Sequence, residues 1–361
     1  MLRIIRLGPA LLCLFLAACG VKGPLQPPLV LTPPKIQPVN LSQRGTRLIL
    51  DWDTPLVYES GVAMVAVPVV EIWGLELTLS PEGNKPRLPS AADFKKFGRR
   101  LAEVKEAVNS GSANLPASFH GTWEYDFDLA KLNRVVFVFS LRLRDLRGRY
   151  SPFSEPVSIV PVNVANPPSK LEVELKEDGI LVRWQGATSS LISGQEVAAA
   201  GYNIYKKGAT SEWLRLNSTP IQALEYNDQD VVMDRVYAYK VRAVVTVDSW
   251  PRESGDSAVL EVEYKDIFPP PAPTGVAVVI SETAVVLSWE PSGAADLAGY
   301  RVRRRLETEA DYHLLTAEPI IRTSFEDRQV EKGRSYYYAI TACDKAGNES
   351  RSTEIKAVVI R

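Results

Sequence analysis

The sequence predicts an all-β protein made of tandem β-sandwiches. Apolar residues that alternate with polar ones and end in a tryptophan occur three times along the chain, as is typical of half-buried strands that face a core. A chain of 361 residues is long enough for two to four globular domains, so we assign one domain to each copy. The three copies are Leu48, Leu50 and Trp52; Ile180, Val182 and Trp184; and Val285, Leu287 and Trp289.

Two further strands are expected after each tryptophan. One opens with a Gly-Tyr pair in the second and third copies, and the other alternates aromatic with small or branched apolar residues. The later strand contains Phe137 and Phe139 in the first copy, Tyr237 and Tyr239 in the second, and Tyr336 and Tyr338 in the third. Alternation places these rings on the buried face of a sheet. We therefore expect the domain cores to be marked by Trp52, Trp184, Trp289, Tyr202, Tyr300, Tyr239 and Tyr338.

This pattern resembles the fibronectin type III domain, an immunoglobulin-like sandwich. A proline-rich entry at 268–273 also fits that family, whereas the paired cysteines of antibody domains are missing. The resemblance is strong over 267–361, extends over 166–266 and is looser over 36–165. It implies domains that bind or space partners through their loops and exposed strand edges.

The first copy carries an insertion at about 85–122. Its tryptophan lies 85 residues before the later aromatic strand, against 53 and 47 residues in the other two copies. Ser90 and Asp93 form a capping-box-like start, and Phe94, Phe97, Leu101, Val104 and Val108 follow at helical spacing. We expect an amphipathic helix over about 90–109 that covers its own sandwich; docking of this helix on a partner is the alternative.

The N-terminus has the layout of a secretory signal. Arg3 and Arg6 precede an apolar run at 7–17 that contains no acidic residue. The following residues, Leu16, Ala17, Ala18 and Cys19, resemble the bacterial lipoprotein box. This resemblance implies removal of 1–18 and lipidation of Cys19. A plain signal peptide, or an uncleaved anchor with a chance cysteine, is the alternative.

The start of the mature chain resembles the LptM-type small outer-membrane lipoproteins. The match lies in Cys19, Gly20, Val21, Lys22, Gly23, Pro24 and Leu25. It implies docking on the outer-membrane β-barrel machinery that inserts lipopolysaccharide. Prolines continue after this motif, so we expect 19–35 to be an extended tether.

Composition excludes several function classes. Lys and Arg total 42 against 43 Asp and Glu, which gives no basic excess for nucleic acid. The two histidines, His120 and His313, lack a second ligand at metal-site spacing. With neither G-x-S-x-G nor a phosphate-binding glycine loop, we expect no enzyme, cofactor or metal. Cys343 would be the one cysteine left without lipid, so no internal disulfide is expected.

Two charged stretches have alternative interpretations. Glu124, Asp126 and Asp128 alternate with aromatic residues, which suits an acidic water face, a carboxylate pair acting on a glycan or a calcium site. Arg301, Arg303 and Arg305 alternate similarly and suit either a solvated face or a site for lipopolysaccharide phosphates.

These observations predict a non-enzymatic envelope lipoprotein held by Cys19 that presents its domains to a protein or glycan. Because Gly20, not aspartate, follows the cysteine, we expect the outer membrane, on its periplasmic face. One alternative is an accessory factor of lipopolysaccharide transport that docks through 19–25. The other is a glycan-active surface protein that uses 119–128.

Overall fold

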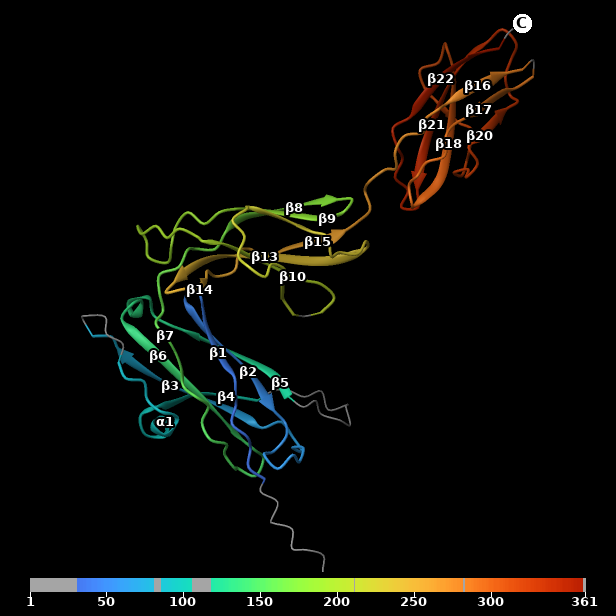
Figure 1. The fold of residues 1–361 in the computed structure, drawn as a ribbon. Helices are drawn as coiled ribbons and strands as arrows, with labels where there is room; N and C mark the ends of the chain where they lie inside the picture. The colour runs from blue at the N-terminus through green and yellow to red at the C-terminus, as the bar shows by residue number, and fades with distance from the viewer. Residues whose placement is uncertain (1–30, 81–85, 106–117, 211, 282, 360–361) are drawn as a thin grey trace, which may run out of the picture. The chain divides into compact units, whose positions relative to one another are not determined.

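The computed structural model describes residues 31–80, 86–105, 118–210, 212–281 and 283–359. These residues divide into two compact units: the first ends at Val162 and omits 44–46, and the second comprises 44–46 and the residues from Asn163 onward. Strands dominate both units, as expected for an all-β chain of tandem immunoglobulin-like sandwiches (Figure 1). No helix in the described part of the chain is long and apolar enough to cross a membrane.

The first unit is one sandwich of two antiparallel sheets. In one sheet β1, β2 and β5 are neighbours in that order, and the other, four-stranded sheet has the order β4-β3-β6-β7. The strands are β1 (Val39–Arg44), β2 (Arg47–Pro55), β3 (Val69–Thr78), β4 (Arg99–Val104), β5 (Ser118–Asp126), β6 (Val135–Arg144) and β7 (Val157–Ile159). Alternate side chains of β2 and β6 point inward, so Trp52, Phe137 and Phe139 are buried in the core.

The inserted helix is shorter than the spacing predicts. The helix α1 (Ala91–Phe97) ends at Gly98, whose backbone is extended, and the chain continues as β4 instead of a further helical turn. Pairing with β3 supplies the backbone hydrogen bonds of 99–104, which explains the change. The Asp93 carboxylate accepts hydrogen bonds from the Ser90 backbone and hydroxyl. Val108 lies outside the described residues.

The short helix covers its own sandwich, as expected. Phe94 is fully buried and packs in one cluster with Val136 and Val138 on the outer face of β6. The helix covers the outer face of β6, which explains why residues on that face are apolar. The opposite face of β6 forms the sandwich core. The helix therefore extends the packing of the four-stranded sheet.

The segment before β1 is already part of the first sandwich. The Glu59 amide donates to the Thr32 carbonyl over 3.1 Å, and Ile36 is fully buried. Lys35 forms an ion pair with Glu155. Packing thus begins within the segment that the sequence assigns to the tether.

The second unit contains two sandwiches of the same plan. The first pairs a β12-β9-β8 sheet with a second sheet in which β13 contacts β10, β14 and β15, and β10 also pairs with β11. Its strands are β8 (Ser169–Lys176), β9 (Gly179–Gln185), β10 (Gly201–Lys207), β11 (Leu214–Arg215), β12 (Glu225–Asp228), β13 (Arg235–Val247), β14 (Trp250–Glu253) and β15 (Leu260–Tyr264).

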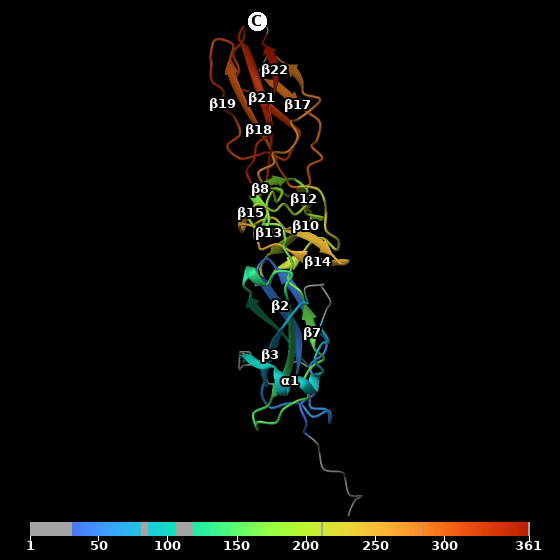
Figure 2. The same ribbon diagram turned by 90° about the vertical axis from the view of Figure 1, so that its left-hand side faces the viewer.

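The C-terminal sandwich pairs a β16-β17-β20 sheet with a β19-β18-β21-β22 sheet. Its long central strands β18 and β21 run side by side in Figures 1 and 2. The strands are β16 (Ala277–Ile280), β17 (Val285–Ser288), β18 (Leu297–Leu306), β19 (His313–Leu314), β20 (Ser324–Asp327), β21 (Ser335–Asp344) and β22 (Thr353–Val358).

Matching aromatic pairs fill the cores of these two sandwiches. Trp184 meets Tyr202 edge-on with ring centroids 5.6 Å apart, and Trp289 meets Tyr300 at 5.2 Å. The edge-to-face arrangement is favourable for aromatic rings. The similar geometry follows from the similar sequence pattern of the second and third copies.

Candidate functional site

A buried charged triad joins the two sheets in the second and third sandwiches. In the second, the Tyr239 hydroxyl donates to Asp228 over 2.7 Å, and Lys206 Nζ lies 3.0 Å from the same carboxylate. In the third, Tyr338 donates to Asp327 over 2.7 Å, and Arg304 pairs with that carboxylate at 2.7 Å. Each buried carboxylate is thereby neutralised and hydrogen-bonded, as burial of a charge requires.

The tyrosines of these triads remain protonated donors. Burial raises the pKa of Tyr239 above its ordinary value, and the hydrogen bond to Asp228 raises it further. Burial and Asp327 raise the pKa of Tyr338 in the same way. The triads therefore serve as fixed polar links between the sheets.

A second tyrosine on the same strands makes a hydrogen bond of the tyrosine-corner type. The Tyr237 hydroxyl accepts from the Val232 amide over 2.9 Å, and the Tyr336 hydroxyl accepts from the Glu331 amide over 2.9 Å. At the matching position of the first sandwich, Phe137 has no hydroxyl for this bond.

The first sandwich replaces the whole triad with uncharged residues. Tyr125 on β5 pairs with Leu48 on β2, and at this register the other two copies have the triad aspartate. Phe139 takes the position of the triad tyrosine. Gly74 on β3 pairs with Phe139 on β6, at the register that the triad lysine or arginine occupies in the other copies. Three side chains that close one end of the other sandwiches are therefore missing here.

A groove occupies this end of the first sandwich. It encloses a volume of about 490 Å³, within the range of small-molecule sites. Phe139 and Phe137 stack nearly parallel at its floor, and Tyr125 lies 5.9 Å from Phe139. Its lining consists of Gly74, Leu75, Glu76, Phe97, Arg99, Leu101, Tyr125, Lys131, Phe137 and Phe139.

Polar groups of both signs stand among the aromatic rings of the groove. Glu76 accepts a hydrogen bond from Tyr125 over 3.3 Å and pairs with Lys131 at 2.7 Å. The hydrogen bond to Glu76 raises the pKa of Lys131, so its ammonium group stays charged. This ammonium lies 5.5 Å from the Phe137 ring centroid. Arg99 is exposed and forms no ion pair with any described residue.

The acidic and aromatic stretch of β5 divides between two faces, as its alternation predicts. Glu124 and Asp126 are exposed and pair with Arg47 at 2.8 and 3.3 Å. Asp128 caps the 3-10 helix η1 (Leu129–Lys131) by accepting from the Ala130 amide. The three carboxylates thus face away from the groove, and Tyr125 is the residue of 119–128 that lines it.

Side-chain partners hold the three arginines of β18 that the sequence singles out. Arg301 and Arg303 both pair with Glu349, at 3.2 and 2.8 Å. Arg305 stacks over Tyr337 with its guanidinium carbon 4.3 Å from the ring centroid. This neutralises most of the stripe that the sequence singles out for phosphate binding.

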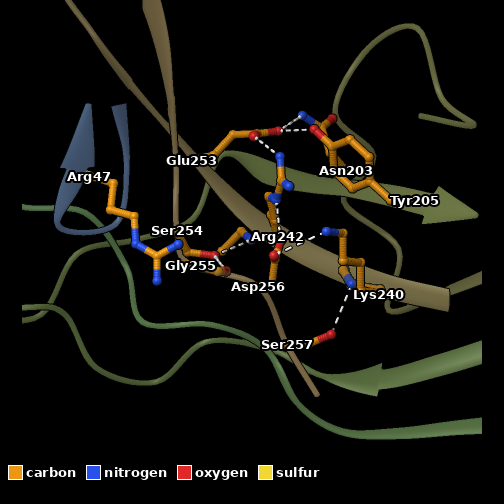
Figure 3. Close-up of polar contacts among 12 residues, drawn as sticks. Arg47, Asn203, Tyr205, Lys240, Arg242, Glu253, Ser254, Gly255, Asp256 and Ser257 are labelled. Atoms are coloured by element: carbon orange, nitrogen blue, oxygen red, sulfur yellow. Dashed lines mark hydrogen bonds and ion pairs between the residues drawn. The ribbon is translucent and has the colours of Figure 1, made fainter. Parts of the chain in front are cut away.

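A second polar cluster crosses β10, β13 and β14 in the second sandwich (Figure 3). Arg242 donates to Glu253 over 2.7 Å and to Asp256 over 2.5 Å, while Lys240 reaches Asp256 at 3.1 Å. Tyr205 also donates to Glu253. Burial alone would raise the pKa of Glu253, but Arg242 and the hydrogen bonds outweigh it and lower that pKa. The donors and acceptors of the cluster are hydrogen-bonded to one another, which indicates that the cluster has a structural role.

Three carboxylates approach one another near the entry to the third sandwich. Asp266, Asp296 and Asp344 have oxygen atoms within 4.8 Å of one another, a grouping that the sequence did not single out as a metal site. Asn348 already donates to the Asp344 carboxylate over 2.8 Å from both its backbone and side-chain nitrogens. An acidic group of this kind is common on protein surfaces without a cation.

The remaining predicted residues fall into four groups. The core markers Trp52, Trp184, Trp289, Tyr202, Tyr300, Tyr239 and Tyr338 are all buried. His120 and His313 lie in different sandwiches and are mostly exposed. Cys343 is buried, and burial raises the pKa of its thiol. The lipobox and docking residues Leu16 to Leu25 lie outside the described residues.

The groove itself was missed by sequence reasoning. Its defining residue, Gly74, has no side chain. Arg99 lies on β4, whose counterparts β11 and β19 in the other copies have two residues each, and Lys131 lies in the connection between β5 and β6. The available signal was a comparison of the three copies by strand register, which shows Phe139 where the others have tyrosine. Spacing alone did not supply that register across the insertion.

Comparisons with known proteins agree with the fold. A family model described as Fibronectin type III domain matches residues 271–358. The chain is 26% identical over 225 residues to the Titin homolog of Caenorhabditis elegans, and this match covers 58% of this chain and 1% of that protein. It is 33% identical over 122 residues to the Amylopullulanase of Thermoanaerobacterium thermosulfurigenes, and this match covers 34% of this chain and 6% of that protein. The chain thus spans a small part of these relatives.

Among solved structures, a two-domain fibronectin type III segment from chicken tenascin matches with 15% identity. This match covers 54% of this chain and 100% of that chain, with a TM-score of 0.35. The family match identifies residues 271–358 as a fibronectin type III domain, and the strand pairing shows that the chain consists of tandem immunoglobulin-like sandwiches.

Proposed function

We propose that this protein is a non-enzymatic, lipid-anchored envelope protein that binds a glycan through the groove of its first sandwich. The observation that carries the proposal is the replacement of a buried charged triad by Tyr125, Phe139 and Gly74. In the other two sandwiches the triad ties the sheets together, whereas the first has a groove with polar groups at its rim. Loss of a stabilising link is expected where a site has another use.

The choice of a glycan over a protein partner has two supports. Aromatic rings beside a carboxylate, a hydroxyl and an ammonium group suit both the C–H faces and the hydroxyls of a sugar. In addition, one relative is named Amylopullulanase, an enzyme that acts on glucans, and its match covers 6% of that protein. So small a share favours a shared accessory domain over shared catalysis.

The anchor is proposed from the resemblance at the N-terminus. Lipid on Cys19 would attach the protein to a membrane, and several acyl chains together give lasting attachment. Replacement of Cys19 by serine is expected to abolish incorporation of an alkyne-tagged fatty acid and to release the protein from the membrane fraction. Unchanged labelling of the C19S variant would rule out this anchor.

A glycan array tests the binding role. Full-length protein in detergent is applied to the array beside the Tyr125→Ala variant and the Tyr150→Ala control, since Tyr150 is an exposed tyrosine that does not line the groove. We expect binding by the wild type and the control, and loss of binding by Tyr125→Ala. Absence of any bound glycan for the wild type would refute the role.

Docking on outer-membrane machinery is the second candidate, because 19–25 resembles the LptM-type start. Affinity capture compares the wild type with a variant in which Lys22, Pro24 and Leu25 are replaced while the lipobox is kept. Loss of a β-barrel partner from the variant is expected if the motif docks. Recovery of the same partners with both proteins would remove this candidate.

A further inference from the structure

We propose that the ligand of this groove is an acidic saccharide, a sugar carrying a carboxylate, and that Arg99 binds that carboxylate. The inference rests on the proposed glycan-binding role and adds the class of sugar and the residue that selects it. It follows from the balance of charge around the groove and from the mixture of ring faces and polar groups that line it.

The charge balance favours an anion. Glu76 is the acidic residue among the lining side chains, and Lys131 at 2.7 Å compensates it. Arg99 then adds a positive charge that no described residue neutralises. Lys96 lies 5.0 Å from the Phe97 ring centroid, but Asp93 is its acidic neighbour. A bound carboxylate would therefore compensate the charge of Arg99.

The geometry of arginine favours a carboxylate within that anion. A guanidinium group offers two parallel N–H donors that match the two oxygens of a carboxylate. Arg99 begins β4, and its backbone is fixed opposite Gly74 on β3. A charge at a fixed position on a strand can orient a ligand, whereas a charge on a free loop would attract it without fixing its position.

The lining favours a sugar over an acyl chain or an acidic peptide. Tyr125 and Leu101 are half-buried, and Phe97 is 64% exposed, so each offers apolar surface to a ring face. The Glu76 carboxylate and the Tyr125 hydroxyl oxygen, 3.3 Å apart, can both accept from sugar hydroxyls, and the Lys131 ammonium group can donate to them. An acyl chain would take these polar groups out of water without offering them hydrogen bonds, which opposes its binding.

Calorimetric titration of the full-length protein in detergent tests the assignment with three probes. Trigalacturonic acid is an acidic trisaccharide, maltotriose is a neutral one, and triglutamate is an acidic peptide. We expect trigalacturonic acid to bind at least tenfold more tightly than the other two, and its binding to weaken as salt is added because the pair is exposed. Equal affinity for maltotriose, or tighter binding of triglutamate, would overturn the assignment.

Two variants locate the binding in the groove. Arg99→Gln keeps a polar side chain but removes the charge, and should weaken trigalacturonic acid binding by about tenfold or more, the loss expected for a charge-assisted contact. Arg147→Gln changes an exposed arginine outside the groove and should leave binding unchanged. Thermal melting of both variants checks that they are folded. Equal binding by folded Arg99→Gln and wild type would refute the role of Arg99.

The outcomes separate this inference from the proposed function. If maltotriose binds as well as trigalacturonic acid and Tyr125→Ala removes both, the groove binds glycans but does not select acidic ones. If neither trisaccharide binds while other glycans on the array do, the acidic class is wrong. If no glycan binds in either experiment, both the glycan role and its refinement fail.

Discussion

Gly74 lies directly opposite Phe139 on the β3–β6 ladder, at the register that Lys206 and Tyr239 occupy in the second sandwich. A lysine and a tyrosine at one end of a sandwich are thus replaced by a glycine and a phenylalanine. Lys206 and Tyr239 both bind Asp228 on the opposite sheet and so link the two sheets. Gly74 and Phe139 have no group for such a link, and this end of the first sandwich has a groove instead.

The first prediction concerns the triad hydroxyls. Tyr239→Phe removes the donor to a buried carboxylate and should destabilise the second sandwich by about 1–3 kcal/mol. Tyr338→Phe should have a similar effect on the third sandwich. Denaturant unfolding measures both, with Tyr226→Phe as control, since the Tyr226 hydroxyl makes no hydrogen bond among the described residues. Equal stability of Tyr239→Phe and the control would contradict the role of the triad.

The second prediction concerns the same position in the first sandwich. Phe139→Tyr adds a hydroxyl group at a position where the first sandwich has no aspartate to accept its hydrogen bond. The change should lower the free energy of unfolding by about 1–3 kcal/mol. Adding Tyr125→Asp supplies the acceptor that the other copies have at this register. A double-mutant cycle should therefore show favourable coupling between the two changes of about 1 kcal/mol. Purely additive effects would show that the register argument is wrong.

The sequence predicted the strands much better than the groove. Burial of alternate residues requires a period of two, so the runs ending in Trp52, Trp184 and Trp289 identify β2, β9 and β17 without knowledge of partners. Phe94 and Leu101 fit a helical period, yet Leu101 belongs to β4, because pairing with β3 overrides a local preference. The groove depends on which residues face each other across sheets, and that pairing is long-range.

The third prediction concerns close packing beside the first tryptophan. A Cβ atom at Gly121 would lie 2.5 Å from the Trp52 ring, so Gly121→Ala should overpack the core and cost about 1–3 kcal/mol. Gly293→Ala is the matched control, since a Cβ there meets no atom within 4 Å. Thermal unfolding of the two variants should show a lower transition for Gly121→Ala. Similar transitions would mean that Trp52 can move aside without cost.

The last prediction concerns the pH dependence of the polar cluster in Figure 3. Burial alone would raise the pKa values of Glu253 and Asp256, but contacts with Arg242 outweigh it and lower both. A carboxyl whose pKa is lowered by folding stabilises the fold above its unfolded pKa of about 4, and this stabilisation is lost as pH falls through the folded value. The second sandwich should therefore lose stability below about pH 4.

Arg242→Gln should show where this dependence originates. At pH 7 the change leaves two carboxylates near each other without their main cation and should cost about 3–5 kcal/mol. Acidification protonates these carboxyl groups, so the stability difference from the wild type should narrow between pH 7 and pH 4. Arg328→Gln, which breaks an exposed pair with Glu326, should cost less than about 1 kcal/mol. Urea unfolding at a series of pH values measures all three proteins, and a difference that stays constant with pH would place the cost of Arg242→Gln in lost packing instead of unpaired charge.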